Sequence, residues 1–184
     1  MIVGGLDPGN KGAVGIYDGA TDQLVTVFDL PAIRVSVTAK SKRWRLLEDE
    51  LHEQFVMLKD LYDMRLLVVE QVRGLPGQSA PNAFQFGETY GVIRTTARFA
   101  GLPLHFASPA VWKLQMNVPK AEASIVAKAN KDFPDHKHLW TSKRGALKHD
   151  RCEAGFLARY AWRKIWPSLQ GREKLRKAVK GAPL

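Results

Sequence analysis

Residues 65–70 read Arg-Leu-Leu-Val-Val-Glu, and this run indicates how the chain is expected to fold. Four successive apolar residues between Arg65 and Glu70 are typical of a strand that is buried on both faces, as in parallel sheets. A Gly- and Pro-containing stretch at 74–77 then breaks the chain. We therefore predict a central strand that ends at a carboxylate.

The remaining elements follow from hydrophobic spacing on either side of this strand. Upstream strands that form a meander are predicted at residues 2–7, 13–17 and 24–30. Helices are predicted at residues 46–58, 82–100, 109–115, 120–131 and 145–164, with a further strand at 104–107 and a basic loop at 133–148. Strands that alternate with helices pair in parallel, so the pattern predicts an α/β fold with a mixed five-stranded sheet flanked by helices.

Length and composition limit the class of protein. The chain has 184 residues, of which 45% are hydrophobic, which suits one core. We predict one domain at residues 1–166 and a basic tail at 167–184. Lys and Arg outnumber Asp and Glu by 28 to 18, and a net charge of +10 indicates a phosphate-rich partner such as nucleic acid.

Cysteine usage and hydropathy bear on location. The single cysteine, Cys152, excludes an intramolecular disulfide framework and multi-cysteine zinc sites, and it suits a reducing compartment. The chain shows neither an export signal at its start nor an apolar run of membrane-spanning length. We therefore expect a cytoplasmic protein with no membrane partner.

Four acids carry the candidate chemistry. Asp7 and Glu70 each stand where an apolar run meets a turn, so they are expected at strand ends. Asp150 and Glu153 are three residues apart, and a helix places such residues on one face. Oxygen-only ligands favour hard cations, and this set suits two Mg²⁺ ions, for which Mn²⁺ can substitute. The alternative is that the first two acids are the polar ends of strands and the second two an ordinary acidic first helical turn.

Several of these segments resemble motifs of the RuvC-type Holliday junction resolvases, the crossover junction endodeoxyribonucleases. Residues 5–9 (Gly-Leu-Asp-Pro-Gly) resemble the first motif, residues 68–72 (Val-Val-Glu-Gln-Val) the second, and residues 150–158 the last. Residues 86–93 are similar to the glycine-bearing helix of the family, and residues 109–113 to a segment with a basic residue near the scissile phosphate. The resemblance extends over roughly residues 1–162.

This resemblance implies a ribonuclease-H-like fold and a Mg²⁺-dependent endodeoxyribonuclease that resolves Holliday junctions by paired nicks. It also implies a homodimer, because symmetric cleavage needs two active sites related by a twofold axis. The implied catalytic residues are Asp7, Glu70, Asp150, Glu153 and Lys113, and the four acids are the implied metal ligands. The expected contacts to branched DNA, especially four-way junctions, are Arg73, Lys113, Lys120, Lys143 and Arg144.

The motifs depart from the cellular members of the family in three places. Glu153 stands where they usually have Asp, the stretch 113–120 is shorter, and Arg73 replaces an aromatic residue. These departures and the basic tail resemble a phage or prophage member. The alternatives are a broader nuclease for forks and flaps or a non-cleaving junction-binding module. An actin-like ATPase would require further glycine-rich motifs and a longer chain.

Overall fold

The computed structural model describes residues 1–9, 11–36, 42–74, 77–141 and 146–172. Its centre is a five-stranded sheet with the order β3-β2-β1-β6-β7. The strands are β1 (Ile2–Asp7), β2 (Ala13–Asp18), β3 (Gln23–Asp29), β6 (Leu67–Glu70) and β7 (Leu104–Ala107). The pairs β1–β2 and β2–β3 are antiparallel, whereas β1–β6 and β6–β7 are parallel. The predicted mixed five-stranded sheet is confirmed.

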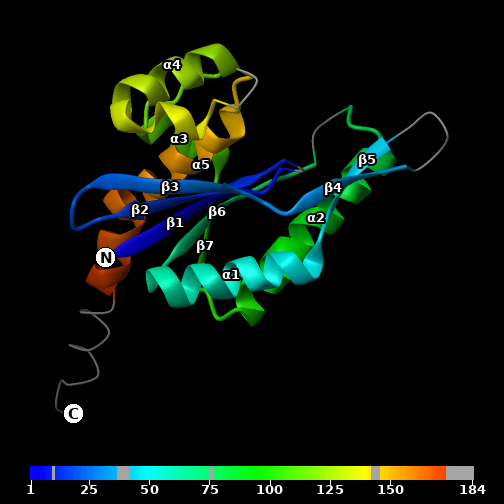
Figure 1. Cartoon of the computed structure of the whole chain (residues 1–184), viewed down its shortest axis with the longest axis horizontal. Coiled ribbons are helices and arrows are strands. Elements are labelled where there is room, and N and C mark those ends of the chain that lie inside the picture. Colours follow the sequence, from blue (N-terminus) through cyan, green and yellow to red (C-terminus); the bar gives the residue numbers. More distant parts are fainter. Residues whose placement is uncertain (10, 37–41, 75–76, 142–145, 173–184) are drawn as a thin grey trace, which may run out of the picture.

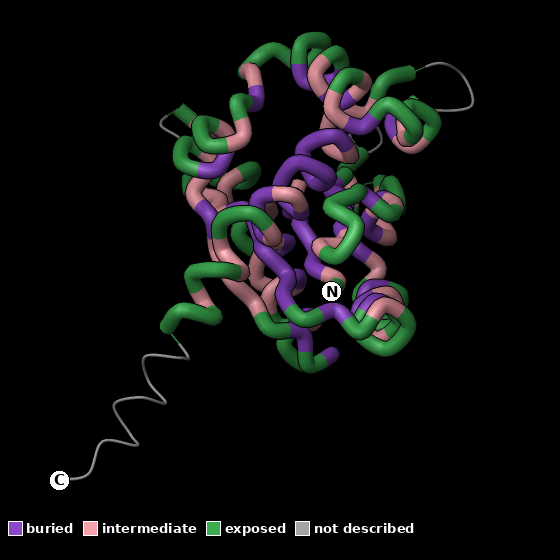
Figure 2. Tube along the Cα trace, turned by 90° about the vertical axis from the view of Figure 1, so that its left-hand side faces the viewer, coloured by how far each residue is buried: buried purple, intermediate pink, exposed green. Residues whose placement is uncertain are grey.

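Helices cover both faces of this sheet (Figure 1). One face carries α1 (Glu48–Tyr62) and α2 (Ala80–Phe99). The other carries α3 (Pro109–Gln115), α4 (Glu122–Asp132) and α5 (His149–Tyr160). Two hydrophobic cores result, one on each side, and the buried chain runs through the middle of the molecule (Figure 2).

The central strand β6 belongs to both cores. Val68 packs in the core on the α5 side, whereas Leu67 and Val69 pack in the core on the α1 and α2 side, and all three are fully buried. Because both faces of β6 are covered by helices, its sequence is continuously apolar rather than alternating.

Helix α5 lies in direct backbone contact with β1 and β2. Gly5 of β1 and Gly15 of β2 are register partners across the antiparallel pair. A Cβ atom on Gly5 would collide with the backbone of Leu157 and Ala158, and one on Gly15 would come within 2.5 Å of the Ala154 carbonyl oxygen. The two glycines therefore provide the space in which the helix backbone sits.

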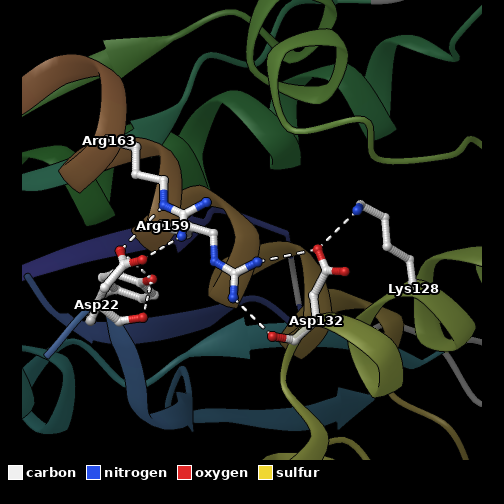
Figure 3. Close-up of polar contacts among 6 residues, drawn as sticks. Asp22, Lys128, Asp132, Arg159 and Arg163 are labelled. Carbon is white, nitrogen blue, oxygen red and sulfur yellow. Dashed lines mark hydrogen bonds and ion pairs between the residues drawn. The ribbon is translucent and has the colours of Figure 1, made fainter.

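Charged residues connect the C-terminal end of α5 to neighbouring elements (Figure 3). Arg159 donates to the Asp132 side chain at 3.2 Å and to the Asp132 carbonyl oxygen at 2.9 Å. Lys128 pairs with the same carboxylate at 2.8 Å, and Arg163 pairs with Asp22. These contacts connect α5 and the helical segment after it to α4 and to the β2–β3 turn.

A second, two-stranded sheet was not predicted. β4 (Ala32–Ser36) and β5 (Lys42–Leu46) form an antiparallel hairpin between β3 and α1. Most of its residues are exposed or half-buried, and of the two strands only Leu46 is buried.

The C-terminal helix extends further than predicted. A π-helical segment (Ala161–Ile165) follows α5, and helical backbone continues through residue 172 because Ile165, Trp166 and Leu169 pack against the core on the α5 side. Residues 173–184 lie outside the described part of the chain, so the separate basic tail stays a prediction. The predicted loop at 133–148 contains a 3₁₀ helix (Pro134–Leu139). Within the described residues, no helix is both long and apolar enough to cross a membrane.

The glycine contact generates a stability prediction. Gly5→Ala forces α5 away from β1, so we expect a loss of about 3 kcal/mol and a melting temperature lower by roughly 6–12 °C. The control is Gly87→Ala in α2, where an added Cβ meets nothing within 4 Å and a helical alanine is favoured by up to about 1 kcal/mol. Thermal unfolding followed by circular dichroism measures both, and equal effects would contradict the packing argument.

Candidate active site

The four acids lie together at one edge of the sheet. β1 and β6 are parallel neighbours, so Asp7 and Glu70 stand at the same edge, each as the last residue of its strand. Asp150 and Glu153 lie near the start of α5, which packs across β1. The charges of Glu70, Asp150 and Glu153 all act on Asp7, so the site comprises acids that are far apart in the sequence.

Asp7 is the most perturbed of the four. Burial, followed by the charges of Glu70, Asp150 and Glu153, raises the pKa of Asp7 from 3.8 to about 8. A hydrogen bond from the Gly9 backbone N–H at 3.2 Å acts in the opposite direction. Because a carboxyl group with such a pKa is largely protonated near neutral pH, the site favours a cation that restores its charge.

Glu70 is held by a tryptophan. The buried indole Nε1–H of Trp112 donates to Glu70 Oε1 at 2.9 Å, and only 9% of Glu70 is exposed. Burial raises the pKa of Glu70, whereas the charge of Lys113 and the Trp112 hydrogen bond lower it. Sequence reasoning missed Trp112, although it precedes the Lys113 that was selected, because nothing local shows that its ring faces an acid 42 residues away.

Lys113 binds the last acid of the site. Its Nζ lies 2.8 Å from both carboxylate oxygens of Glu153, and 8% of Glu153 is exposed. The short helix α3 thus presents two adjacent residues to two different acids, Trp112 to Glu70 and Lys113 to Glu153. The ammonium group is therefore within the acid cluster and compensates part of its charge.

Asp150 has a histidine partner. His149 Nε2 lies 2.8 Å from Asp150 Oδ1, and His149 Nδ1 lies 3.4 Å from Glu122 Oε2. Burial raises the pKa of Asp150, and the nearby charges of His149 and Lys11 act to lower it. Glu122, from the first turn of α4, is a further acid near the site that the sequence analysis did not select.

The donor set fits hard divalent cations in its chemistry. It consists of carboxylate oxygens, which Mg²⁺ and Mn²⁺ prefer. Among the described residues, no three His, Cys, Asp or Glu side chains are grouped closely enough to hold an ion as they stand. Glu153 is turned to Lys113 with both of its carboxylate oxygens, whereas Asp150 contacts His149 with one.

The other predicted site residues lie outside this cluster. Arg73 is exposed in the segment after β6, and Lys120 is exposed between α3 and α4; neither forms an ion pair with a described residue. Lys143 and Arg144 lie outside the described residues. Their contacts to DNA, and the catalytic and metal-binding roles of the acids and Lys113, stay predictions.

Solved structures with this fold are known. The structure of Thermus thermophilus RuvC in complex with Holliday junction substrate aligns with a TM-score of 0.55 and 16% identity, over 88% of this chain and 94% of that chain. The yeast mitochondrial Holliday junction resolvase Ydc2 aligns with a TM-score of 0.54 and 14% identity, over 96% of this chain and 83% of that chain. No protein-family model and no curated protein sequence matches. The chain therefore has the ribonuclease-H-like fold of the RuvC-type resolvases, as the sequence motifs predicted.

Removal of the Asp7 charge is expected to stabilise the metal-free protein. The folded protein binds the Asp7 proton more tightly than the unfolded chain, so stability falls as the pH rises from 3.8 to about 8. At pH 8 we expect Asp7→Asn to raise the melting temperature in EDTA by roughly 3–8 °C, or about 1–2 kcal/mol, and to flatten this pH dependence. Mg²⁺ should stabilise the wild type more than the variant. A lower melting temperature for Asp7→Asn throughout this pH range would contradict the assignment of Asp7 to a repulsive cluster.

Trp112→Phe is expected to raise the pKa of Glu70, because the donor that favours the charged carboxylate is lost. Carboxyl-carbon NMR of the Glu70 side chain measures this pKa. The matched control is Trp140→Phe, which removes a buried indole donor to Asn130 Oδ1, also at 2.9 Å. Both changes should cost about 1–2 kcal/mol of stability, and only the first should move the Glu70 titration. An unchanged Glu70 titration in Trp112→Phe would refute this role.

Proposed function

We propose that this chain is a metal-dependent, structure-selective endodeoxyribonuclease that resolves four-way DNA junctions by paired nicks. The observation that carries the proposal is the position of the four acids. Asp7 and Glu70 stand at the ends of adjacent parallel strands, and α5 brings Asp150 and Glu153 to the same place, within a RuvC-type fold.

Two Mg²⁺ ions, or Mn²⁺ ions in their place, are the proposed cofactors, with Asp7, Glu70, Asp150 and Glu153 as their ligands. When bound, the ions supply an activated water for attack at phosphorus and charge stabilisation for the leaving 3′ oxygen. The raised pKa values of Asp7, Glu70 and Asp150 support a cation site, because an added positive charge relieves the repulsion within the cluster.

Two neighbouring residues prepare the site. Trp112 holds one oxygen of Glu70 and thereby fixes the orientation of that carboxylate. Lys113 compensates Glu153, and if Glu153 held a metal ion, the Lys113 ammonium group would be available to the charge of the scissile phosphate. We assign Lys113 to the catalytic machinery on this ground.

The proposed substrate is branched DNA, and the proposed assembly is a homodimer. The net charge of +10 favours phosphate binding, and the T. thermophilus relative of the fold is described with a Holliday junction substrate. Paired nicks across a junction require two active sites related by a twofold axis. Arg73, Lys120, Lys143 and Arg144 are proposed as contacts to the backbone of the junction arms.

The decisive experiment compares a synthetic four-way junction with a linear duplex of matched sequence, in Mg²⁺ or in EDTA, and maps the nicks on each strand. We expect symmetric nicks at the branch point, only with Mg²⁺ and only on the junction. Equal cleavage of flaps and forks would broaden the function to a general branched-DNA nuclease. Tight junction binding without cleavage would indicate a junction-binding module.

Glu70→Gln tests the acids within the same assay. Loss of the charge at the end of β6 should lower the cleavage rate by at least 10³-fold, while junction affinity in EDTA stays within about threefold. The control is Asp63→Asn, an exposed acid after α1 whose loss leaves cleavage unchanged. A Glu70→Gln protein that cleaves at the wild-type rate would remove Glu70 from the site.

A further inference from the structure

A cleft of about 780 Å³ lies between the β4–β5 hairpin and the start of α5. The hairpin contributes Ala32 and Trp44 to its lining, and the opposite wall includes His149 and the candidate ligand Asp150. One wall of the cleft thus belongs to the acid site, and the other belongs to the sheet that hydrophobic spacing did not reveal.

Trp44 organises the hairpin wall. Arg34 is its register partner on β4, and the Arg34 guanidinium lies 5.9 Å from the centre of the Trp44 ring. Lys11, from the β1–β2 turn, places its Nζ 5.6 Å from the same ring. Two cations from separate segments therefore gather at one half-buried indole, at the border of the cleft.

The hairpin is held in this place by α2. Gln85 Nε2 donates to the Trp44 backbone oxygen at 2.9 Å. This bond uses the backbone of Trp44, so the indole and its two cations remain available to the cleft.

The basic side chains of the two walls differ in whether they are paired with a carboxylate. On the α5 side, Lys148 and Arg151 both bind the Asp29 carboxylate, Lys148 at 2.6 Å and the Arg151 Nε at 2.5 Å. Lys11 and Arg34 form no ion pair with any residue in the described part of the chain. The two cations at Trp44 therefore have no carboxylate within ion-pair distance among the described residues, although the charge of Lys11 acts on Asp150 from further away.

We propose that Lys11 and Trp44, which line this cleft, form a binding site for the phosphates of the DNA backbone together with Arg34, which lies beside Trp44 on β4. The site holds a substrate strand beside the acids, from the side opposite α5. The inference rests on the proposed function, because it assigns a position to the DNA that the nuclease would cut. Two cations that are held close together by one aromatic ring suit the negative charge of a phosphodiester.

A structural role is the competing explanation, in which the two cations only cover Trp44. Under that explanation, removal of either charge changes stability without changing how DNA binding depends on salt. If the two residues contact phosphates, the result differs. With one contact fewer, DNA binding releases fewer counterions, so the affinity for DNA depends less steeply on salt concentration.

The test measures binding of the full chain to a four-way junction and to a linear duplex in EDTA, as a function of salt. We expect Lys11→Gln and Arg34→Gln each to reduce the magnitude of the negative slope of log K against log [salt], where K is the association constant for DNA, by about 0.9. The double variant should reduce it by about twice that amount. The matched control is the double variant Lys59→Gln with Arg98→Gln, which removes the same charge from the last turns of α1 and α2. Its slope should equal that of the wild type.

Trp44→Leu provides a second measurement that does not alter charge. Loss of the ring that positions both cations should weaken junction binding at least threefold at 0.1 M salt, with the fold checked by circular dichroism. Wild-type slopes in the Lys11 and Arg34 variants would overturn the inference. Equal slope losses in the control variant would also overturn it, because the effect would then be one of net charge.

The outcomes separate this inference from the proposed function. Wild-type protein that cleaves junctions, with unchanged slopes in the variants, leaves the function standing and removes the hairpin site. If the wild type binds DNA without cleaving it and the variants have reduced salt slopes, the proposed nuclease function is wrong and the hairpin binding site is supported. Protein that binds no DNA overturns both.

Discussion

The structure depends on one close contact, the seating of the α5 backbone on the Gly5–Gly15 pair. Ala154 and Ala158 of α5 are four residues apart and meet Gly15 and Gly5 respectively. Asp150 lies four residues before Ala154, so it continues the same line along the helix. The contact therefore sets Asp150 beyond the end of β1, beside Asp7. A side chain at either glycine would move the helix and separate the acids.

The cost of bringing these acids together is met locally. Four carboxyl groups that share a partly buried site repel one another, and burial adds a desolvation penalty. Three neighbouring groups partly stabilise the charged carboxylates. The Trp112 indole N–H donates to Glu70, the Gly9 backbone N–H donates to Asp7, and the Lys113 ammonium group pairs with Glu153. Each compensates a different acid, and none neutralises the whole set. The repulsion that remains destabilises the folded protein, and the proposed cations would relieve it.

What could be predicted from the sequence was set by local pattern. The strands of the main sheet follow from apolar runs. The acids were selected because Asp7 and Glu70 end such runs and Asp150 and Glu153 share a helical face, and the structure brings all four together. Trp112 and the β4–β5 hairpin were missed for a different reason. Trp112 gains its role from Glu70, 42 residues away, and the hairpin is held by the Gln85 side chain across 41 residues. Neither contact leaves a periodic signal, because each depends on tertiary structure.

The direction of the strands explains why the site is at this edge and not at the other. β1, β6 and β7 are parallel, so their carboxyl ends meet at one edge of the sheet. Asp7 and Glu70 are the last residues of the first two strands, and β7 leads directly into α3, which carries Trp112 and Lys113. Functional groups gather at the carboxyl ends of parallel strands because the chain leaves the sheet there and side chains are free to converge. The antiparallel strands β2 and β3 contribute the surface on which α5 rests, so each half of the mixed sheet has a separate part in forming the site.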